Sequence, residues 1–365
     1  MSSSHFPTDA SSALALITGA AYTAAHFRQD WPVLVAAVRH APPANRMQWV
    51  MGLERLAGLI VLQPDSLELQ GGLARLAAVA GYPGLTLDCL QRLDVKGGLS
   101  DQDLLLMIEV CLTTGDTDRA ARVAATLRRQ GLRTPGLVQL QDRIDQRLSD
   151  SQQPWRQPFA FGPQMLLDPL QPDHADALAR QYRDPATALL TGLPEIGADL
   201  TAEQWIERRL QDSPATYAWV HRRLGLVGYG DLYLHRQAGY LCMWVGTDFR
   251  GQGLGRSVVR ALCQMAFRRG LDLVLSSAYE NNQRSIRSLQ ANQFIPIPVR
   301  AEEPDHERRF FSLSTTPITP TRARRRLVEF CDLTHTGVRF RPGWFAPESA
   351  PIPLTTDKEL SWPST

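Results

Sequence analysis

The first part of the chain has apolar residues at three- and four-residue spacing, which is the period of an α-helix buried on one side. The spacing recurs at Leu73, Leu76, Ala77 and Ala80, at Leu104, Leu105, Ile108 and Leu112, and at Ala120, Val123, Ala124 and Leu127. Ser100 followed by Asp103 is typical of a helix start, and Gly115 is typical of a helix end. The pattern therefore predicts an all-α N-terminal domain over residues 1–150.

The helix ends of this domain are spaced almost regularly. Gly81 and Gly115 lie about 34 residues apart, which is the period of tetratricopeptide (TPR) helix pairs. Ala120 takes a position where that repeat has a small residue, but Thr86 takes the equivalent position after Gly81. The rest of the repeat signature is missing. Two alternatives stay open, a TPR-like helical repeat and an irregular helical bundle.

The pattern changes after residues 151–162, which are polar and contain proline, as linkers do. Strand-like runs are expected at residues 165–167, 215–221, 225–234, 240–245, 271–277, 294–299 and 309–313. Helices are expected at residues 173–183, 201–210, 254–269 and 285–292. Three adjacent strands followed by alternating helices and strands predict a mixed sheet, antiparallel at first and βαβ later. We therefore expect an α/β domain with flanking helices over residues 163–318.

The end of the chain has a different composition. Four arginines, Arg322, Arg324, Arg325 and Arg326, precede a strand-like run at residues 327–333. Residues 342–365 are rich in Pro, Ser and Thr. The sequence predicts a tail over residues 319–365 that is first basic and then Pro/Ser/Thr-rich.

The overall composition is that of a globular protein with room for two domains. Hydrophobic residues make up 44% of the 365 residues and charged residues 21%. The net charge of +2 lacks the strong positive field of a dedicated nucleic-acid binder. The five cysteines are odd in number and form no CxxC pair, which argues against a zinc site or a disulfide framework. We expect no metal and no nucleic-acid partner.

The start of the chain contains a short apolar run, Ala13–Ile17, without a preceding Lys or Arg. A secretory signal would need a basic segment before the apolar one. No stretch reaches the roughly 20 apolar residues of a membrane span. The sequence therefore predicts a cytoplasmic protein with no membrane span.

The most informative stretch runs from Trp244 to Arg256, where a strand ends, a glycine-rich turn follows and a long amphipathic helix begins. Gly251, Gly253 and Gly255 have no Cβ atoms, so backbone N–H groups can converge on one point. The helix N-terminus adds the positive end of its dipole, which suits a phosphate. The spacing differs from the dinucleotide fingerprint, and the Lys-Ser/Thr ending of a P-loop is absent. A tight turn that needs glycines only for packing stays open.

Two motifs in this half resemble those of a known family. Arg250-x-x-Gly253-x-Gly255 is similar to the R/Q-x-x-G-x-G/A motif that opens the third helix of GNAT acetyltransferases. The segment from Asn282 to Leu289 is similar to the N-x-x-S-I-x-x-L signature of the RimJ/RimL-type subfamily. The resemblance covers about residues 160–315 and implies the GNAT-like mixed sheet.

The resemblance also implies a co-substrate, acetyl-CoA or a longer acyl-CoA. Its pyrophosphate is expected on the glycine-rich turn, and its pantetheine arm between the strands that end at Val245 and near Ser276. A backbone N–H near Val245 would stabilise the oxyanion of the reaction. The expected cofactor-binding residues are Trp244, Val245, Arg250, Gly251, Gln252, Gly253, Leu254, Gly255, Arg256 and Asn282.

The resemblance leaves the acid and the base of the reaction open. Leu289 stands where many family members have a tyrosine that protonates the leaving thiolate, so the acid is Ser285, a water molecule or no group at all. The base must take a proton from the amine. Its candidates are Tyr279 and Glu280 at a strand end, followed by Asp231 and His221. The expected catalytic residues are Glu280, Tyr279 and Ser285.

The sequence thus predicts an N-acyltransferase that moves an acyl group from CoA to an amine of a protein, peptide or small molecule. Acetyl is the expected acyl group. The helical domain would offer a groove for a peptide or protein acceptor. One alternative keeps the fold and transfers a longer acyl chain to a peptide. The other is a non-catalytic scaffold that only binds CoA, which the missing tyrosine favours and the intact glycine motif disfavours.

Overall fold

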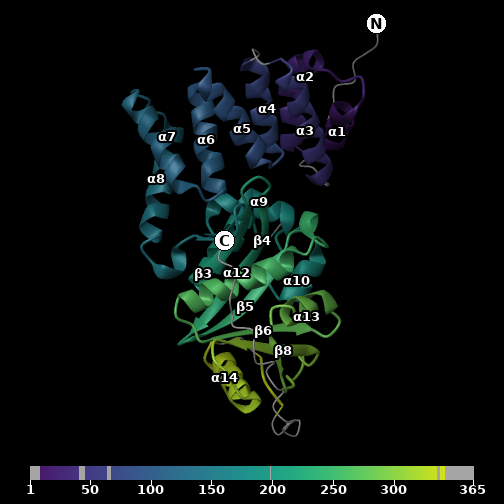
Figure 1. Cartoon of the computed structure of the whole chain (residues 1–365), viewed down its shortest axis with the longest axis vertical. Helices are drawn as coiled ribbons and strands as arrows, with labels where there is room; N and C mark the ends of the chain where they lie inside the picture. The colour runs from purple at the N-terminus through teal and green to yellow at the C-terminus, as the bar shows by residue number, and fades with distance from the viewer. Residues whose placement is uncertain (1–8, 41–45, 64–66, 198, 335–337, 342–365) are drawn as a thin grey trace.

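The computed structural model describes residues 9–40, 46–63, 67–197, 199–334 and 338–341 (Figure 1). Its first part is a row of helices at one end of the molecule, and its second part is a sheet with helices on both faces. The helices of the first part are α1 (Ala10–Thr18), α2 (Ala24–His40), α3 (Arg46–Val61), α4 (Leu67–Val79), α5 (Pro83–Val95), α6 (Asp101–Thr113), α7 (Thr117–Arg129) and α8 (Pro135–Asp150). The all-α prediction for this part is confirmed. Whether it is a TPR-like repeat stays a prediction.

The ends of these helices follow from local sequence chemistry. The Ser100 side chain accepts the N–H of Asp103, whose carboxylate accepts the N–H of Ser100, so α6 begins with a reciprocal capping box. Gly81 and Gly115 follow α4 and α6 with φ of 74° and 75°, a conformation in which glycine has no steric penalty. The predicted helix start and end are therefore correct.

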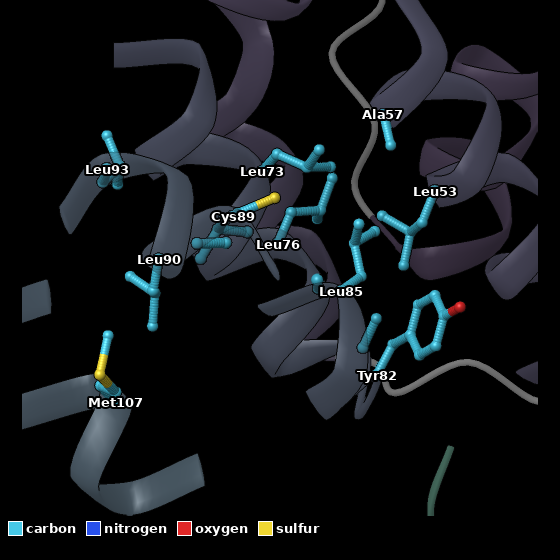
Figure 2. Close-up of a cluster of buried hydrophobic side chains, with 14 of the residues drawn as sticks. Leu53, Ala57, Leu73, Leu76, Tyr82, Leu85, Cys89, Leu90, Leu93 and Met107 are labelled. Atoms are coloured by element: carbon cyan, nitrogen blue, oxygen red, sulfur yellow. The ribbon is translucent and has the colours of Figure 1, made fainter. Parts of the chain in front are cut away.

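The helices are joined by one hydrophobic core, and Figure 2 shows part of it. Side chains from α3, α4, α5 and α6 meet there: Leu53, Ala57, Leu73, Leu76, Leu85, Cys89, Leu90, Leu93 and Met107. Each helix buries an apolar stripe against its neighbours, and this burial stabilises the row of helices as one body.

The second part is built around a sheet of eight strands, in the order β1-β2-β3-β4-β5-β6-β8-β7. The strands are β1 (Phe159–Ala160), β2 (Met165–Pro169), β3 (Ala215–His221), β4 (Gly225–His235), β5 (Ala238–Val245), β6 (Leu273–Tyr279), β7 (Ile295–Ile297) and β8 (Arg308–Ser314). The helices are α9 (Ala175–Gln181), α10 (Pro185–Thr191), α11 (Ala202–Asp212), α12 (Leu254–Arg268), α13 (Gln283–Gln290) and α14 (Pro320–Leu333), with short 3-10 turns at Pro154–Arg156, Pro172–His174 and Thr247–Phe249.

The strand pairing confirms the predicted mixed sheet. The strands β1 to β5 pair antiparallel in sequence order, and β8 pairs antiparallel with both β6 and β7. The pair β5 and β6 is parallel and is connected through α12, which makes the βαβ unit. This arrangement is the GNAT-like fold class expected from the sequence.

The two faces of the sheet are covered by different helices. On one face, Val258 and Leu262 of α12 and Leu289 of α13 pack in one cluster with alternate strand residues; we call this the α12 face. On the other, Trp205 of α11 packs on β3, β4 and β5, and Phe330 of α14 packs on β5, β6 and β8; we call this the α11 face. Among the described residues, no helix is both long and apolar enough to cross a bilayer.

The structure corrects the predictions from the sequence at three points. Residues 320–333 form the helix α14 instead of the expected strand, because Ala323, Leu327 and Phe330 have helical spacing and Thr319 caps the N-terminus. The helix α10 was not predicted. Residues 159–160, inside the expected linker, form β1 and pair with β2. The Pro/Ser/Thr-rich part of the tail, residues 342–365, lies outside the described residues.

The helical part and the sheet are in direct contact. Arg147 of α8 forms ion pairs with Asp168 (2.8 Å) and Asp173 (3.0 Å), and all three side chains are almost fully buried. A second contact joins α5 to the β3–β4 turn, where the N–H of Gly84 donates to the carbonyl of Arg223 at 3.0 Å. We therefore treat the boundary between the two parts as a packed junction.

Candidate active site

The strands β5 and β6 separate part-way along the sheet. Their pairing runs from Ala238 with Leu273 to Leu241 with Ser276. Beyond that point β5 continues to Val245 along β4, and β6 continues to Tyr279 along β8. We call the point after Leu241 and Ser276 the fork. The backbone edges that face each other beyond the fork are available to another partner.

A cavity of about 1110 Å³ occupies the fork and continues on both faces of the sheet. On the α12 face it is lined by Arg256, Ser285 and Ser288, and on the α11 face by Arg209 and Thr334. Residues 242–245 of β5 and 277–279 of β6 form its walls between the two faces. The fork therefore connects two chambers through the sheet.

The glycine loop, residues 246–255, borders this cavity at the N-terminus of α12. Gly251 and Gly253 have φ of 82° and 75°, and a Cβ added at either would meet no atom within 4 Å. These two glycines are therefore needed for their positive φ, and not because a neighbouring atom leaves no room for a Cβ. Anion binding by the loop stays a prediction. Gly253 is the N-cap of α12, so the free N–H groups of the first turn lie at the loop.

Side chains from α9 and α10 hold the glycine loop in position. Arg250, a predicted cofactor-binding residue, pairs with Asp184 and Thr187. Gln181 donates to Asp248 at 2.8 Å and accepts the Asp248 N–H at 3.3 Å. The Arg250 guanidinium therefore anchors the loop to α10, and the exposed backbone of the loop borders the cavity.

The N-terminal half of α13 forms the next part of the wall. The Asn282 side chain accepts the N–H of Ser285 at 3.2 Å, so Asn282 is the N-cap of α13 and lines the cavity at the same time. The Ser288 hydroxyl is buried, has no hydrogen-bond partner among the described residues and also lines the cavity. A buried hydroxyl without a partner is rare, and a polar ligand in the cavity would satisfy it.

Three arginines surround the glycine loop on the α12 face. Arg256 of α12 and Arg284 and Arg287 of α13 all line the cavity and are exposed. Within the described part of the chain, none of them forms a salt bridge. Together with the helix N-terminus, they make this end of the cavity attractive to a polyanion.

A network of ionisable groups, centred on the buried Arg209 and Asp231, lies on the α11 face of the cavity. Arg209 of α11 contacts Asp212 (3.0 Å), Asp231 (3.3 Å) and the hydroxyls of Tyr229 and Tyr233. Tyr229 donates to Asp231 at 2.8 Å. Burial raises the pKa of Asp231 to about 6, against the opposing effect of the Arg209 charge. The network fixes Arg209 and Tyr233 at the edge of the cavity.

The candidate catalytic residues differ in their positions. Tyr279 and Ser285 line the cavity, and the Tyr279 hydroxyl accepts a hydrogen bond from Arg308 at 3.3 Å. Glu280 is not among the described residues that line it; its half-exposed carboxylate pairs with Arg309 at 3.1 Å. Glu280 follows the last residue of β6, and its described contacts are with Arg309 and not with the residues that line the cavity.

The cofactor candidates are brought together with one exception. Trp244, Val245, Arg250, Gly251, Gly253, Leu254, Gly255, Arg256 and Asn282 line the cavity. Gln252 is exposed on the glycine loop and is not among the described lining residues. Sequence reasoning missed Ser288, Arg209 and Arg308, although Ser288 lies one helical turn after Ser285. Among the described residues, no cluster of His, Cys, Asp or Glu is suited to a metal ion.

A comparison with protein families fits this geometry. Residues 164–295 match the family model described as an acetyltransferase (GNAT) domain. The chain carries a GNAT acetyltransferase domain. This GNAT domain contains the glycine loop, the fork and α13, whereas α14 and all of the N-terminal helices lie outside the matched residues.

Solved structures with a similar fold are also found, whereas no curated protein matches the chain. A GNAT-family acetyltransferase from Bacillus anthracis is 9% identical with a TM-score of 0.38, over 43% of this chain and 98% of that one. A ribosomal-protein-S5-alanine acetyltransferase from Vibrio fischeri is 16% identical with a TM-score of 0.38, over 44% and 99%. A spermidine N-acetyltransferase from Vibrio cholerae, in complex with CoA and spermine, is 10% identical with a TM-score of 0.37, over 41% and 95%.

Proposed function

We propose that the protein transfers an acetyl group from acetyl-CoA to a primary amine on a peptide, a protein or a small molecule. The observation that carries the proposal is the cavity that passes through the sheet at the fork, with the glycine loop at one end. A donor and an acceptor entering from opposite faces would meet between β5 and β6.

The donor is proposed to lie on the α12 face. The N–H groups at the start of α12 would hold the pyrophosphate, and Arg256, Arg284 and Arg287 would neutralise the phosphate charges. The pantetheine amides would pair with the open edges of β5 and β6 beyond the fork. The unpaired hydroxyl of Ser288 would complete the contacts of the arm. The residues present therefore suit CoA in charge and in hydrogen bonding.

The chemistry proposed at the fork is direct transfer. The amine nitrogen attacks the thioester carbon, and a backbone N–H of β5 near Val245 stabilises the oxyanion. The C–S bond then breaks, the sulfur leaves as thiolate, and the amine loses a proton. Tyr279 and Ser285 are the groups proposed to exchange protons there, because both line the cavity. Glu280 is left out, since its carboxylate is engaged by Arg309.

The acceptor is proposed to approach from the α11 face. A peptide or protein acceptor would gain additional surface from the helical part, which is packed against the sheet through Arg147 and Gly84. Its amine would reach the thioester beside Tyr233, Tyr240 and Tyr279.

The test combines CoA binding with thiol release. Gly253→Val introduces a β-branched side chain at φ 75°, directly at the loop, and should weaken CoA binding at least about tenfold by calorimetry. Gly270→Val is the matched control, because Gly270 has φ 91° and equally open surroundings at the far end of α12. It should cause similar strain without changing CoA affinity. Equal losses in both variants would remove the glycine loop from the cofactor site.

Turnover is followed as free thiol released from acetyl-CoA and from a long-chain acyl-CoA, with peptides and small amines as acceptors. Release from acetyl-CoA alone supports acetyl transfer, and faster release from the long-chain donor supports the lipidation alternative. Tight CoA binding without thiol release for any amine would support the scaffold alternative and refute the enzyme.

A further inference from the structure

The C-terminal helix α14 lies outside the matched GNAT residues, yet it packs on the sheet beside the fork. Thr319 accepts the N–H of Arg322 at 3.3 Å and caps its start. Further along, the Phe330 ring stacks on Tyr240 at 5.8 Å between ring centroids. Tyr240 directly precedes Leu241, the last β5 residue that pairs with β6, so α14 is anchored directly at the fork.

The last turn of α14 forms part of the cavity wall. Cys331 and Thr334 line the cavity together with Tyr240 and Arg308 of the sheet. The Thr334 hydroxyl donates to the Phe330 carbonyl at 2.6 Å, which fixes its side chain at the helix end. The chamber on the α11 face is therefore closed on one side by a helix that is not part of the matched domain.

The hydroxyls of this chamber are also fixed. Tyr240 donates to Ser277 at 2.6 Å, across the strands β5 and β6. Tyr279 accepts from Arg308, whose guanidinium lies 4.9 Å from the centroid of the Tyr279 ring. An acceptor that enters this chamber therefore meets a preformed wall, whose tyrosine side chains are held by hydrogen bonds.

Charges are arranged differently on the two sides of the fork. On the α11 face Arg308 pairs with Asp305 at 2.9 Å, and Arg209 pairs with both Asp212 and Asp231. Each guanidinium there already has at least one carboxylate. On the α12 face, by contrast, Arg256, Arg284 and Arg287 form no salt bridge among the described residues. Among the residues that the structure describes, the α11 chamber therefore offers no uncompensated positive charge to an anion.

We propose that α14 is a specificity-determining part of the acceptor site, and that Thr334 and Cys331 limit the space beside the acceptor amine. The chamber selects amines whose neighbouring groups are neutral or cationic and disfavours those with a nearby carboxylate. The proposal rests on the proposed acetyl transfer for its turnover measurements, but not for its binding measurements.

The first test changes the wall in the full-length protein. Thr334→Trp should raise the acceptor KM at least about tenfold and leave the Kd for CoA within about twofold, because CoA lies across the fork. Arg325→Trp is the matched control, since Arg325 is exposed on the same helix. It should change neither quantity. If Thr334→Trp does not fold, Thr334→Leu is measured, and retained CoA binding reports its folding. An unchanged acceptor KM in a folded variant would overturn the proposal.

The second test addresses the proposed discrimination against amines with a nearby carboxylate. The probes are three tripeptides with a free N-terminal amine that differ only in Ala, Lys or Asp at the second position. Their binding to the CoA-loaded protein is measured by calorimetry, and their kcat/KM by thiol release. The Ala and Lys peptides should exceed the Asp peptide at least about tenfold in both. Equal or stronger binding of the Asp peptide, or no binding of any of them, would overturn the proposal. Binding without thiol release would instead refute the acetyl transfer.

Discussion

Replacing Arg147 tests whether the helical part and the sheet form one stable unit. Arg147→Met keeps the apolar stem of the side chain and removes its charge. Asp173 would keep its contact with Arg143. Asp168, which is fully buried, would keep His174 as its one ion-pair partner among the described residues. Removing one partner of a buried ion pair costs about 3–5 kcal/mol, because the other charge stays buried without compensation.

The cost should depend on pH in a defined direction. Burial pushes the pKa of Asp168 upward, but the Arg147 charge and the His174 ring at 3.2 Å outweigh it and hold the pKa below its usual value. In the wild type this stabilisation is present above the unfolded pKa, about 4, and is lost as the pH falls through the folded pKa. In Arg147→Met burial dominates and raises the pKa of Asp168. The difference between the two proteins should therefore shrink as the pH is lowered from about 7 to about 5.

Urea unfolding followed by far-UV circular dichroism measures both effects. With an m value of about 3 kcal/mol/M, the midpoint should fall by about 1–2 M at neutral pH. Arg28→Met is the control, because the pair of Arg28 with Glu68 is exposed and 3.9 Å long. It should change the stability by less than about 0.5 kcal/mol. Equal midpoints for Arg147→Met and the wild type, or a deficit that grows in acid, would refute the reasoning.

Two further substitutions follow from the contacts described above. Ser288→Ala removes the buried hydroxyl on the cavity wall and should raise the Kd for CoA about threefold to tenfold, corresponding to about 0.5–1.5 kcal/mol; an unchanged Kd in calorimetry would mean that the hydroxyl does not meet the cofactor. Gly84→Ala would bring a Cβ to 2.7 Å from the Arg223 Cα, so the junction must shift at a cost of about 1–3 kcal/mol, whereas a Cβ at Gly58 of α3 would meet nothing within 4 Å. Thermal unfolding should therefore lower the Tm only for Gly84→Ala, and a similar change in Gly58→Ala would contradict the steric argument.

The sequence predicted best those elements whose signals are local. The strand β3 was expected at residues 215–221 and is found there, because its pattern of apolar residues is bounded by clear turns. The capping box at Ser100 also depends on neighbouring residues alone. The sequence predicts a strand where α14 is found, because the four arginines interrupt the apolar positions. The helical spacing of those positions is recognisable only when the segment is considered from Thr319, which caps the helix.

The site shows the same division between local and tertiary information. The glycine loop was predictable because its conformation is required by residues 250–255 themselves. Glu280 was placed in the site because it follows a strand of the fork, but the pairing of β6 with β8 directs its carboxylate to Arg309. Arg209, Arg308 and Thr334 belong to elements far apart in the sequence. They meet at one cavity because α11 and α14 pack on the same face of the sheet.

The junction between the two halves extends further than the ion pair of Arg147. Arg180 of α9 packs against Gly81 of the helical part, at 3.2 Å from where a Cβ would lie. The next residue, Gln181, holds Asp248 of the glycine loop. A shift of the helices against the sheet would thus reach the loop through two consecutive residues. In a chain shortened at Ser151, the glycine loop, which is the proposed donor site, would lose this indirect support from the helical part. Insertions or domain exchanges at that boundary are expected to affect the loop in the same way.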